Sequence, residues 1–167
     1  MNPCLNVDAN FFSPANWPDY TTSRLRVGWI SEDSVGGRQA PDIFQLAAHL
    51  PMITITTLDW SAARDNLFEI VSFFEKIEVL LLLEEYNNDP YIPSIGAAMG
   101  RAVVADSSNL FPFNHGDTGL VVANSVLANR AENLAKALIY LKADPTLRAT
   151  LGKSLRRKYL ELQKVGN

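Results

Sequence analysis

The segment Ile77–Leu83 constrains the fold more than any other part of the sequence, because it is apolar at every position except Glu78. A strand-length run without alternation of polar and apolar residues predicts a strand buried on both faces, as in the middle of a parallel sheet. Four shorter runs rich in apolar or β-branched residues predict further strands, at 25–30, 52–57, 102–105 and 120–122. Two segments have apolar residues at helical spacing, at 41–50 and 66–76, and a short helix of small residues is predicted at 94–99. This alternation predicts a parallel sheet with helices on both faces.

Two further helices are predicted at the end of the chain, at 129–143 and 145–165. Asp144 suits the N-cap of the second helix, and Pro145 suits its first turn, where a missing N–H costs nothing.

The start of the chain has a different character. Residues 1–23 combine Asn, Pro, Ser and Thr with scattered aromatic residues, which is typical of an extended leader. A chain of 167 residues is too short for two domains of ordinary size. We therefore predict a linker at 1–23 and one α/β domain at 24–167.

Charge and cysteine content narrow the expected partners and location. The formal net charge is −3 and no long block of Lys and Arg occurs, so neither nucleic acid nor anionic lipid is an expected partner of the whole molecule. A solvated helix face accounts for the basic cluster Lys153, Arg156, Arg157 and Lys158. The single Cys4 favours a reducing compartment, and we expect the cytoplasm. No apolar run is long enough for a transmembrane segment, and the first residues do not resemble a signal peptide.

Ligand sites in an open parallel sheet lie beyond the carboxyl ends of the strands, so the loops at 31–38, 84–90 and 106–119 are the candidates. Their glycines do not have the spacing of a dinucleotide fingerprint or a P-loop, and plain turns remain an equal alternative.

His49 and His115 have no Cys or carboxylate partners at metal-ligand spacing, so no metal site is expected. A serine-hydrolase elbow, Gly-x-Ser-x-Gly, does not occur.

Segments spread over nearly the whole chain carry a family resemblance: 7–14 (VDANFFSP), 26–30 (RVGWI), 90–106 (PYIPSIGAAMGRAVVAD), 114–122 (NHGDTGLVV) and 133–148. In order and spacing they resemble the carboxy-terminal domain of the GT-B glycosyltransferases of family 4, also called group 1. The resemblance implies a Rossmann-like three-layer sandwich that is one half of a GT-B fold. It also implies a hexosyltransferase of carbohydrate biosynthesis that uses a nucleoside diphosphate sugar as donor and needs no other cofactor. The implied partner is an N-terminal GT-B domain, either separate or missing.

The same resemblance implies a donor site formed by the loop after the first strand and by the segment that leads into the helix at 94–99. The implied binding residues are Gly28, Trp29, Ser31, Gly37, Arg38, Asn88, Asp89, Pro90, Ser94, Ile95 and Gly96. The family carries two glutamates with seven residues between them, and alignment through Gly100 places Asn87 and Ile95 at their positions. Asn87 is the implied catalytic position, since an amide is able to donate and accept hydrogen bonds with a hexose, whereas Ile95 has no group for a ribose diol. Arg38 is the nearest cation for a phosphate.

Two other interpretations stay open. The lost glutamates favour a catalytically degenerate binding or scaffold module of the same fold. A receiver-like or flavodoxin-like regulator is a different class, but the sequence lacks its early acidic pair and a phosphorylatable Asp in a suitable place. Finally, the stretch between Leu50 and Ile77 is shorter than in the glycosyltransferase family, which predicts that a βα unit is lost.

Overall fold

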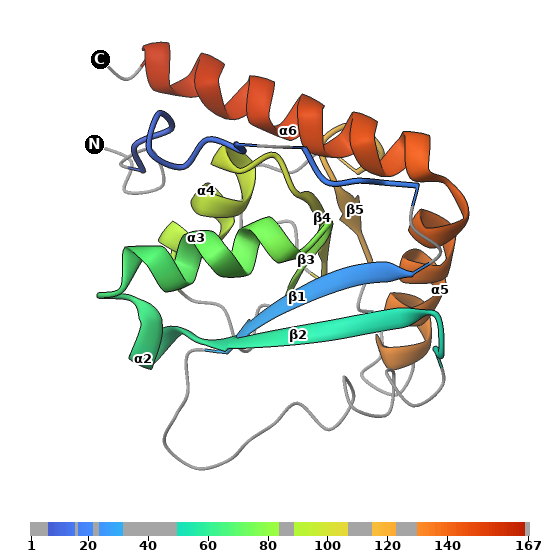
Figure 1. The fold of residues 1–167 in the computed structure, drawn as a ribbon. Helices are drawn as coiled ribbons and strands as arrows, with labels where there is room; N and C mark the ends of the chain where they lie inside the picture. The colour runs from blue at the N-terminus through green and yellow to red at the C-terminus, as the bar shows by residue number, and fades with distance from the viewer. Residues whose placement is uncertain are drawn as a thin grey trace.

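The protein is described by a computed structural model that covers residues 7–15, 17–21, 24–31, 50–83, 89–106, 115–122 and 130–165. Within these residues a single sheet of five parallel strands has the order β2-β1-β3-β4-β5 (Figure 1). The strands are β1 (Leu25–Ser31), β2 (Ile53–Asp59), β3 (Val79–Leu82), β4 (Ala102–Ala105) and β5 (Leu120–Val121). The predicted parallel sheet is confirmed, and the fold is a Rossmann-like α/β sandwich.

The described helices are α2 (Trp60–Ala63), α3 (Leu67–Lys76), α4 (Tyr91–Ala98), α5 (Arg130–Ala143) and α6 (Pro145–Val165). The N-cap predicted at Asp144 is confirmed, since its Oδ1 accepts a hydrogen bond of 2.8 Å from the N–H of Leu147. The periodicity of the sequence did not predict α2. This helix begins after Asp59, whose side chain accepts hydrogen bonds from the backbone N–H groups of Ser61 and Ala62. The helix predicted at 41–50 falls, except for Leu50, outside the described residues.

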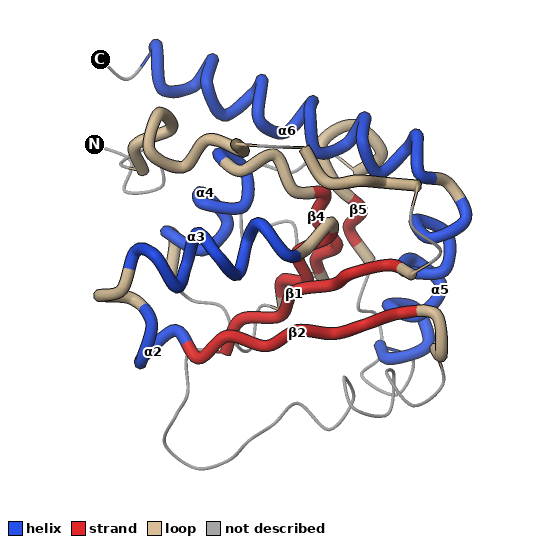
Figure 2. The backbone as a smooth tube through the Cα atoms, in the orientation of Figure 1, coloured by secondary structure: helices blue, strands red, loops and turns tan. Residues whose placement is uncertain are grey.

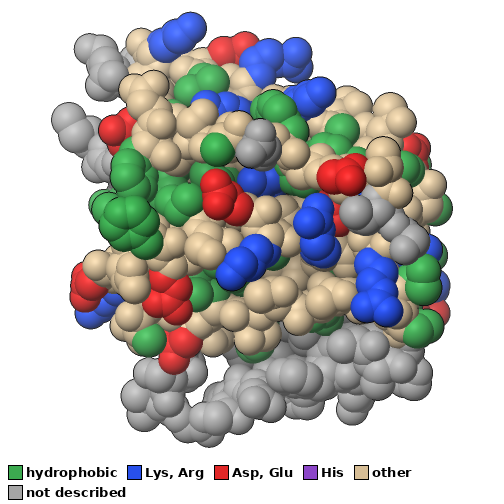
Figure 3. Space-filling model, in the orientation of Figure 1, with side chains coloured by type: hydrophobic (Ala, Val, Ile, Leu, Met, Phe, Trp, Pro, Cys, Tyr) green, Lys and Arg blue, Asp and Glu red, His purple; other side chains and the backbone are tan. Residues whose placement is uncertain are grey.

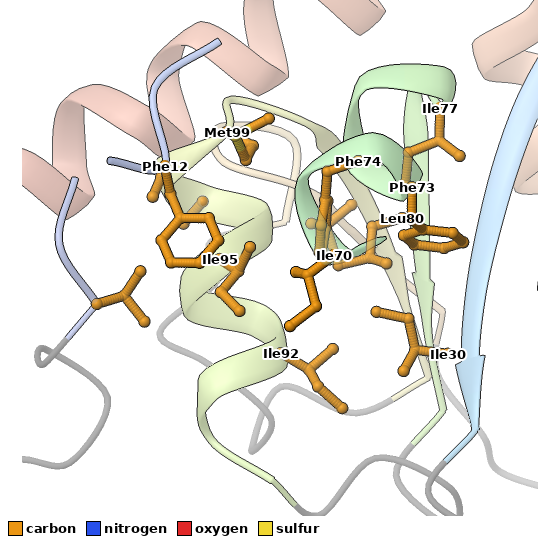
Figure 4. Packing of buried hydrophobic residues seen from close by; sticks show 14 of the residues in the cluster. Phe12, Ile30, Ile70, Phe73, Phe74, Ile77, Leu80, Ile92, Ile95 and Met99 are labelled. Atoms are coloured by element: carbon orange, nitrogen blue, oxygen red, sulfur yellow. The ribbon is translucent and has the colours of Figure 1, made fainter. Parts of the chain in front are cut away.

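Successive residues of each strand point to opposite faces of the sheet, and each face has its own apolar core. On one face Ile30 and Leu80 pack with side chains of α3, α4 and the second half of α6 (Figure 4). On the other face Trp29 and Leu81 pack with Leu138 and other side chains of α5. The backbone trace shows helices on both sides of the strands (Figure 2).

The middle position predicted for Ile77–Leu83 is confirmed. β3 pairs with β1 on one side and with β4 on the other, in parallel register, and all four of its residues are buried. Glu78, the polar residue of this run, lies at the amino edge of the sheet. Its Oε2 accepts hydrogen bonds from the backbone N–H of Arg26 at 3.1 Å and from Nε of Arg26 at 3.3 Å. Its Oε1 lies 3.3 Å from Nη2 of the buried Arg148.

The leader, here residues 7–15, lies against α6 and does not extend away from the domain (Figure 1). The carbonyl oxygen of Val7 accepts hydrogen bonds from the Tyr159 hydroxyl at 3.0 Å and from Nε2 of Gln163 at 2.6 Å. The Arg156 guanidinium donates to the carbonyl oxygens of Phe12, at 3.3 Å, and of Ala98. Arg156 therefore joins the leader to both α6 and the end of α4.

We expect Arg156→Met to loosen the leader without unfolding the sheet, because the substitution removes the guanidinium that donates to the Phe12 carbonyl oxygen and keeps most of the side-chain volume. Hydrogen exchange followed by mass spectrometry should show faster exchange in residues 7–15 and unchanged exchange in β1 and β3. Arg157→Met is the matched control, since Arg157 is exposed on the same helix. If hydrogen exchange in the leader is unchanged in the Arg156 variant, Arg156 does not hold the leader against α6 and α4.

Candidate functional site

The carboxyl ends of β1 and β3 form the topological switch point of the sheet. The chain passes from β1 to β2 on one side and then returns to β3, which pairs with β1 on its other side. A crevice opens at such a point because the loops after the two strands leave in opposite directions. Residues 32–49 and 84–88, which follow the two strands, lie outside the described residues.

A cavity of about 350 Å³ lies beside this edge, among the leader, α2, α3 and the start of α4. Its wall is largely apolar and aromatic, with contributions from Val7, Phe12, Trp60, Ile70, Tyr91 and Ile95. Figure 4 shows how Phe12 of the leader lies beside Ile95 of α4. Three carboxylates and one cation complete the lining, namely Asp8, Asp65, Asp89 and Arg64. Aromatic rings beside carboxylates suit the apolar faces and hydroxyl groups of a sugar or nucleoside better than a free phosphate.

Asp89 connects two walls of this cavity. Its Oδ2 accepts a hydrogen bond of 2.8 Å from Nε1 of Trp60, and its Oδ1 accepts one of 2.8 Å from the N–H of Tyr91. The N–H of Ile92 donates to the Asp89 carbonyl oxygen at 3.3 Å, and Pro93 has no N–H to offer. The first amides of α4 are therefore already used within the chain.

The other predicted residues of α4 are buried. The Ser94 hydroxyl donates to the carbonyl oxygen of Pro90 at 2.9 Å. Ile95 is 3% exposed and belongs to the apolar core, although it also lines the cavity. Gly96 lies against β3, where an added Cβ would come within 2.7 Å of Cδ2 of Leu80.

The predicted residues of β1 occupy different positions along the strand. Gly28 packs under α3, where an added Cβ would meet Cδ1 of Ile77 at 2.5 Å. Trp29 points into the core on the opposite face. Ser31 ends the strand and is partly exposed, so it is the β1 residue nearest the switch point. Four predicted residues, Gly37, Arg38, Asn87 and Asn88, lie outside the described residues.

The carboxyl end of β4 is closed by a buried ion pair. Asp106 follows the strand and its Oδ2 lies 2.6 Å from Nη2 of Arg130, the first residue of α5. The two charges neutralise each other, so this ion pair holds the start of α5 at the end of β4 and does not add net charge there.

Exposed apolar side chains lie at or beside the cavity. Leu67 and Tyr91 line it, Phe11 precedes the lining residue Phe12, and Phe68 follows Leu67. Phe68 is 86% exposed, and Phe11, Leu67 and Tyr91 are each between 41% and 50% exposed. Figure 3 shows hydrophobic side chains gathered on the side of the molecule where the leader and α3 meet. We call these four residues the apolar patch.

No group of three His, Cys, Asp or Glu side chains occurs in the described part of the chain at positions suited to a metal ion. None of the described helices is long and apolar enough to cross a membrane. In the turn before β5, Nδ1 of His115 accepts a hydrogen bond of 3.1 Å from the N–H of Val121.

Known structures share this fold. A crystal structure of the C-terminal domain of a glycosyl transferase group 1 family protein, LpcC from Francisella tularensis, superposes with a TM-score of 0.61 at 15% identity. The match covers 95% of this chain and 98% of that domain. A structure of accessory secretory protein 1, 2 and 3 from Streptococcus pneumoniae matches with a TM-score of 0.53 at 9% identity. That match covers 95% of this chain but 38% of the other chain. No protein-family model and no curated protein matches the sequence.

These likenesses establish the fold: the chain has the architecture of the C-terminal domain of a group 1 glycosyltransferase family protein. Of the residues that line the cavity, the sequence predicted Asp89 and Ile95 as binding residues but not the others, above all Trp60, Phe12 and Tyr91. The one sequence feature that pointed to these aromatic residues was the group of aromatic residues in the leader.

Proposed function

We propose that the chain is the donor-binding half of a glycosyltransferase-like protein, and that its carboxyl edge binds a nucleoside diphosphate sugar. One observation carries this proposal: the switch point between β1 and β3 occurs in a fold similar, over 95% of the chain, to a group 1 glycosyltransferase domain. Open α/β sheets bind their ligands at this position.

In this proposal the loop after β1 supplies the diphosphate contacts. The first amides of α4 are occupied by Asp89, so a cation from the other loop is needed to balance the phosphates. Arg38 is the candidate, because a guanidinium binds phosphate through two parallel hydrogen bonds. The same cation would stabilise the charge that develops on the leaving diphosphate. Asn87, Asn88 and Asp89 are then the polar groups available to the sugar.

Hexosyl transfer in this proposal needs a second, N-terminal domain of the GT-B type, which would bring the acceptor site. The apolar patch supports such a contact, since contiguous exposed apolar side chains on a soluble domain commonly mark an interaction surface. Because Leu67 and Tyr91 of the patch also line the cavity, a domain docked there would also shield a donor bound in it from water.

We expect calorimetric titration with UDP, GDP and ADP, and then with the matching sugar nucleotides, to show saturable binding of one base. Arg38→Ala should weaken that binding by about tenfold or more, because a hydrogen bond to a charged group contributes about 1.5–3 kcal/mol. The titration thereby tests donor binding and identifies the base together.

Arg64→Ala is the matched control, since it removes an exposed cation from the cavity wall and leaves the loop after β1 unchanged. If Arg64→Ala weakens nucleotide binding and Arg38→Ala does not, the role of Arg38 is contradicted. The phosphates would then be assigned to the cavity, beside Arg64.

A second candidate is a binding or scaffold module without transferase activity. The observation that favours it is the buried Ile95, which stands at the position of the second family glutamate and contributes an apolar wall. The second structural neighbour is named as an accessory secretory protein, so the fold is not restricted to proteins named as transferases. A folded sample that gives no heat with any nucleotide or sugar nucleotide would select this candidate.

A further inference from the structure

The exposed side of α6 carries a row of cations, Lys153, Arg157 and Lys164, which we call the basic stripe. These positions recur at helical spacing and lie opposite Leu155 and Tyr159, which face the interior. In Figure 3 several Lys and Arg side chains lie along the edge of the molecule that α6 forms in Figure 1, and others lie elsewhere on the same face.

Charge is strongly segregated onto this helix. α6 holds six basic residues and one acidic residue, Glu161, and so has a net charge of +5. Because the whole chain has a net charge of −3, the remainder has −8. The net charge of the molecule therefore conceals a cationic surface beside an acidic body, and that surface attracts anions locally.

The basic stripe borders a groove of about 300 Å³ between α6 and the leader, lined also by Trp17, Arg156, Leu160 and one carboxylate, Glu161. Trp17 is 40% exposed, with the outer part of its ring packed on the backbone of Gly100. Nζ of Lys153 lies 5.7 Å from the centre of the Trp17 ring. The structure thus holds a partly exposed indole in a groove whose other lining side chains are mostly cations.

We propose that this face binds peripherally to an anionic lipid bilayer, with the basic stripe on the headgroup phosphates and Trp17 at the interface. Lys and Arg near an anionic leaflet add to its attraction, and Trp is a side chain favoured at the membrane–water boundary. Single-stranded nucleic acid suits the surface less well, because a base stacks on an open aromatic face and Lys153 lies over that of Trp17. The proposal does not depend on donor binding.

The test is sedimentation of the full chain with vesicles of phosphatidylcholine alone or mixed with phosphatidylglycerol. We expect binding to the mixed vesicles alone, and weaker binding as salt is raised, since the Debye length falls to about 8 Å at physiological ionic strength. The triple variant K153Q/R157Q/K164Q should bind about tenfold more weakly or worse. Arg156 stays unchanged because it holds the leader.

The matched control is K76Q/K136Q/K142Q, which removes the same charge from α3 and α5 and should bind like the unmodified chain. Brominated lipids should quench Trp17 fluorescence, since Trp29 and Trp60 are buried. The proposal is overturned by absence of binding to mixed vesicles, by equal losses in the two triple variants, or by unquenched Trp17. Preferential binding of single-stranded DNA at the same salt would overturn it in favour of nucleic acid.

Discussion

Glu78→Gln is expected to destabilise the fold by about 3–5 kcal/mol, because it removes one partner of a buried ion pair and leaves the other charges uncompensated. The Glu78 side chain is fully buried and its carboxylate faces Arg26 and Arg148. The glutamine amide keeps the shape and one acceptor, so the loss of charge is the main change. Urea unfolding monitored by tryptophan fluorescence measures the difference in the free energy of unfolding.

Arg101→Met is the matched control within the same buried region. The Arg101 guanidinium is fully buried and meets no hydrogen-bond acceptor among the described residues. Burial lowers the pKa of Arg101 to about 10, so the group is still charged at neutral pH. Since Met retains much of the volume and removes the buried charge, we expect equal or higher stability. A Glu78 variant as stable as the unmodified chain, or an equal loss in both variants, would contradict this account.

The fold was largely predictable because its strongest signals are local. The run at 77–83, apolar except for Glu78, indicated a central strand, and β3 lies there, paired on both sides. The Asp144–Pro145 pair marked a helix start through its own hydrogen-bonding chemistry. α2 was not predicted, because four residues are too few to show a helical period and its cap, Asp59, ends a strand.

The site was less predictable because its walls come from distant parts of the chain. The cavity joins the leader to α2 and α4, and no periodicity relates Phe12 to Trp60 or Asp89. The role of a glycine was also ambiguous from the sequence. Gly28 was predicted to contact the ligand, whereas in the structure it packs under α3, where a side chain would clash with Ile77. The role of Gly28 in donor binding therefore stays a prediction.

The leader connects α6 to the cavity. The carbonyl oxygen of Val7 and the ring of Phe12 are held by α6 and α4, and the same segment supplies one wall of the cavity. A helix at the end of the chain thus shapes a cavity at the carboxyl edge of the sheet. Substitutions that separate α6 from the sheet are expected to affect both stability and the cavity.

Gly152→Ala is the substitution that tests this most directly, and we expect it to destabilise the protein by about 2 kcal/mol or more through overpacking. Helix propensity alone predicts the opposite sign, since alanine in a helix interior is favoured over glycine by about 1 kcal/mol. At Gly152, however, an added Cβ would come within 2.2 Å of the Gly100 carbonyl oxygen, and a backbone atom yields less easily than a side chain. Gly96→Ala is the matched helical control, because its Cβ would meet the end of the Leu80 side chain, so a smaller loss is expected. Thermal unfolding of both variants decides the point: a Gly152 variant as stable as the unmodified chain would mean that α6 does not rest on the turn after α4.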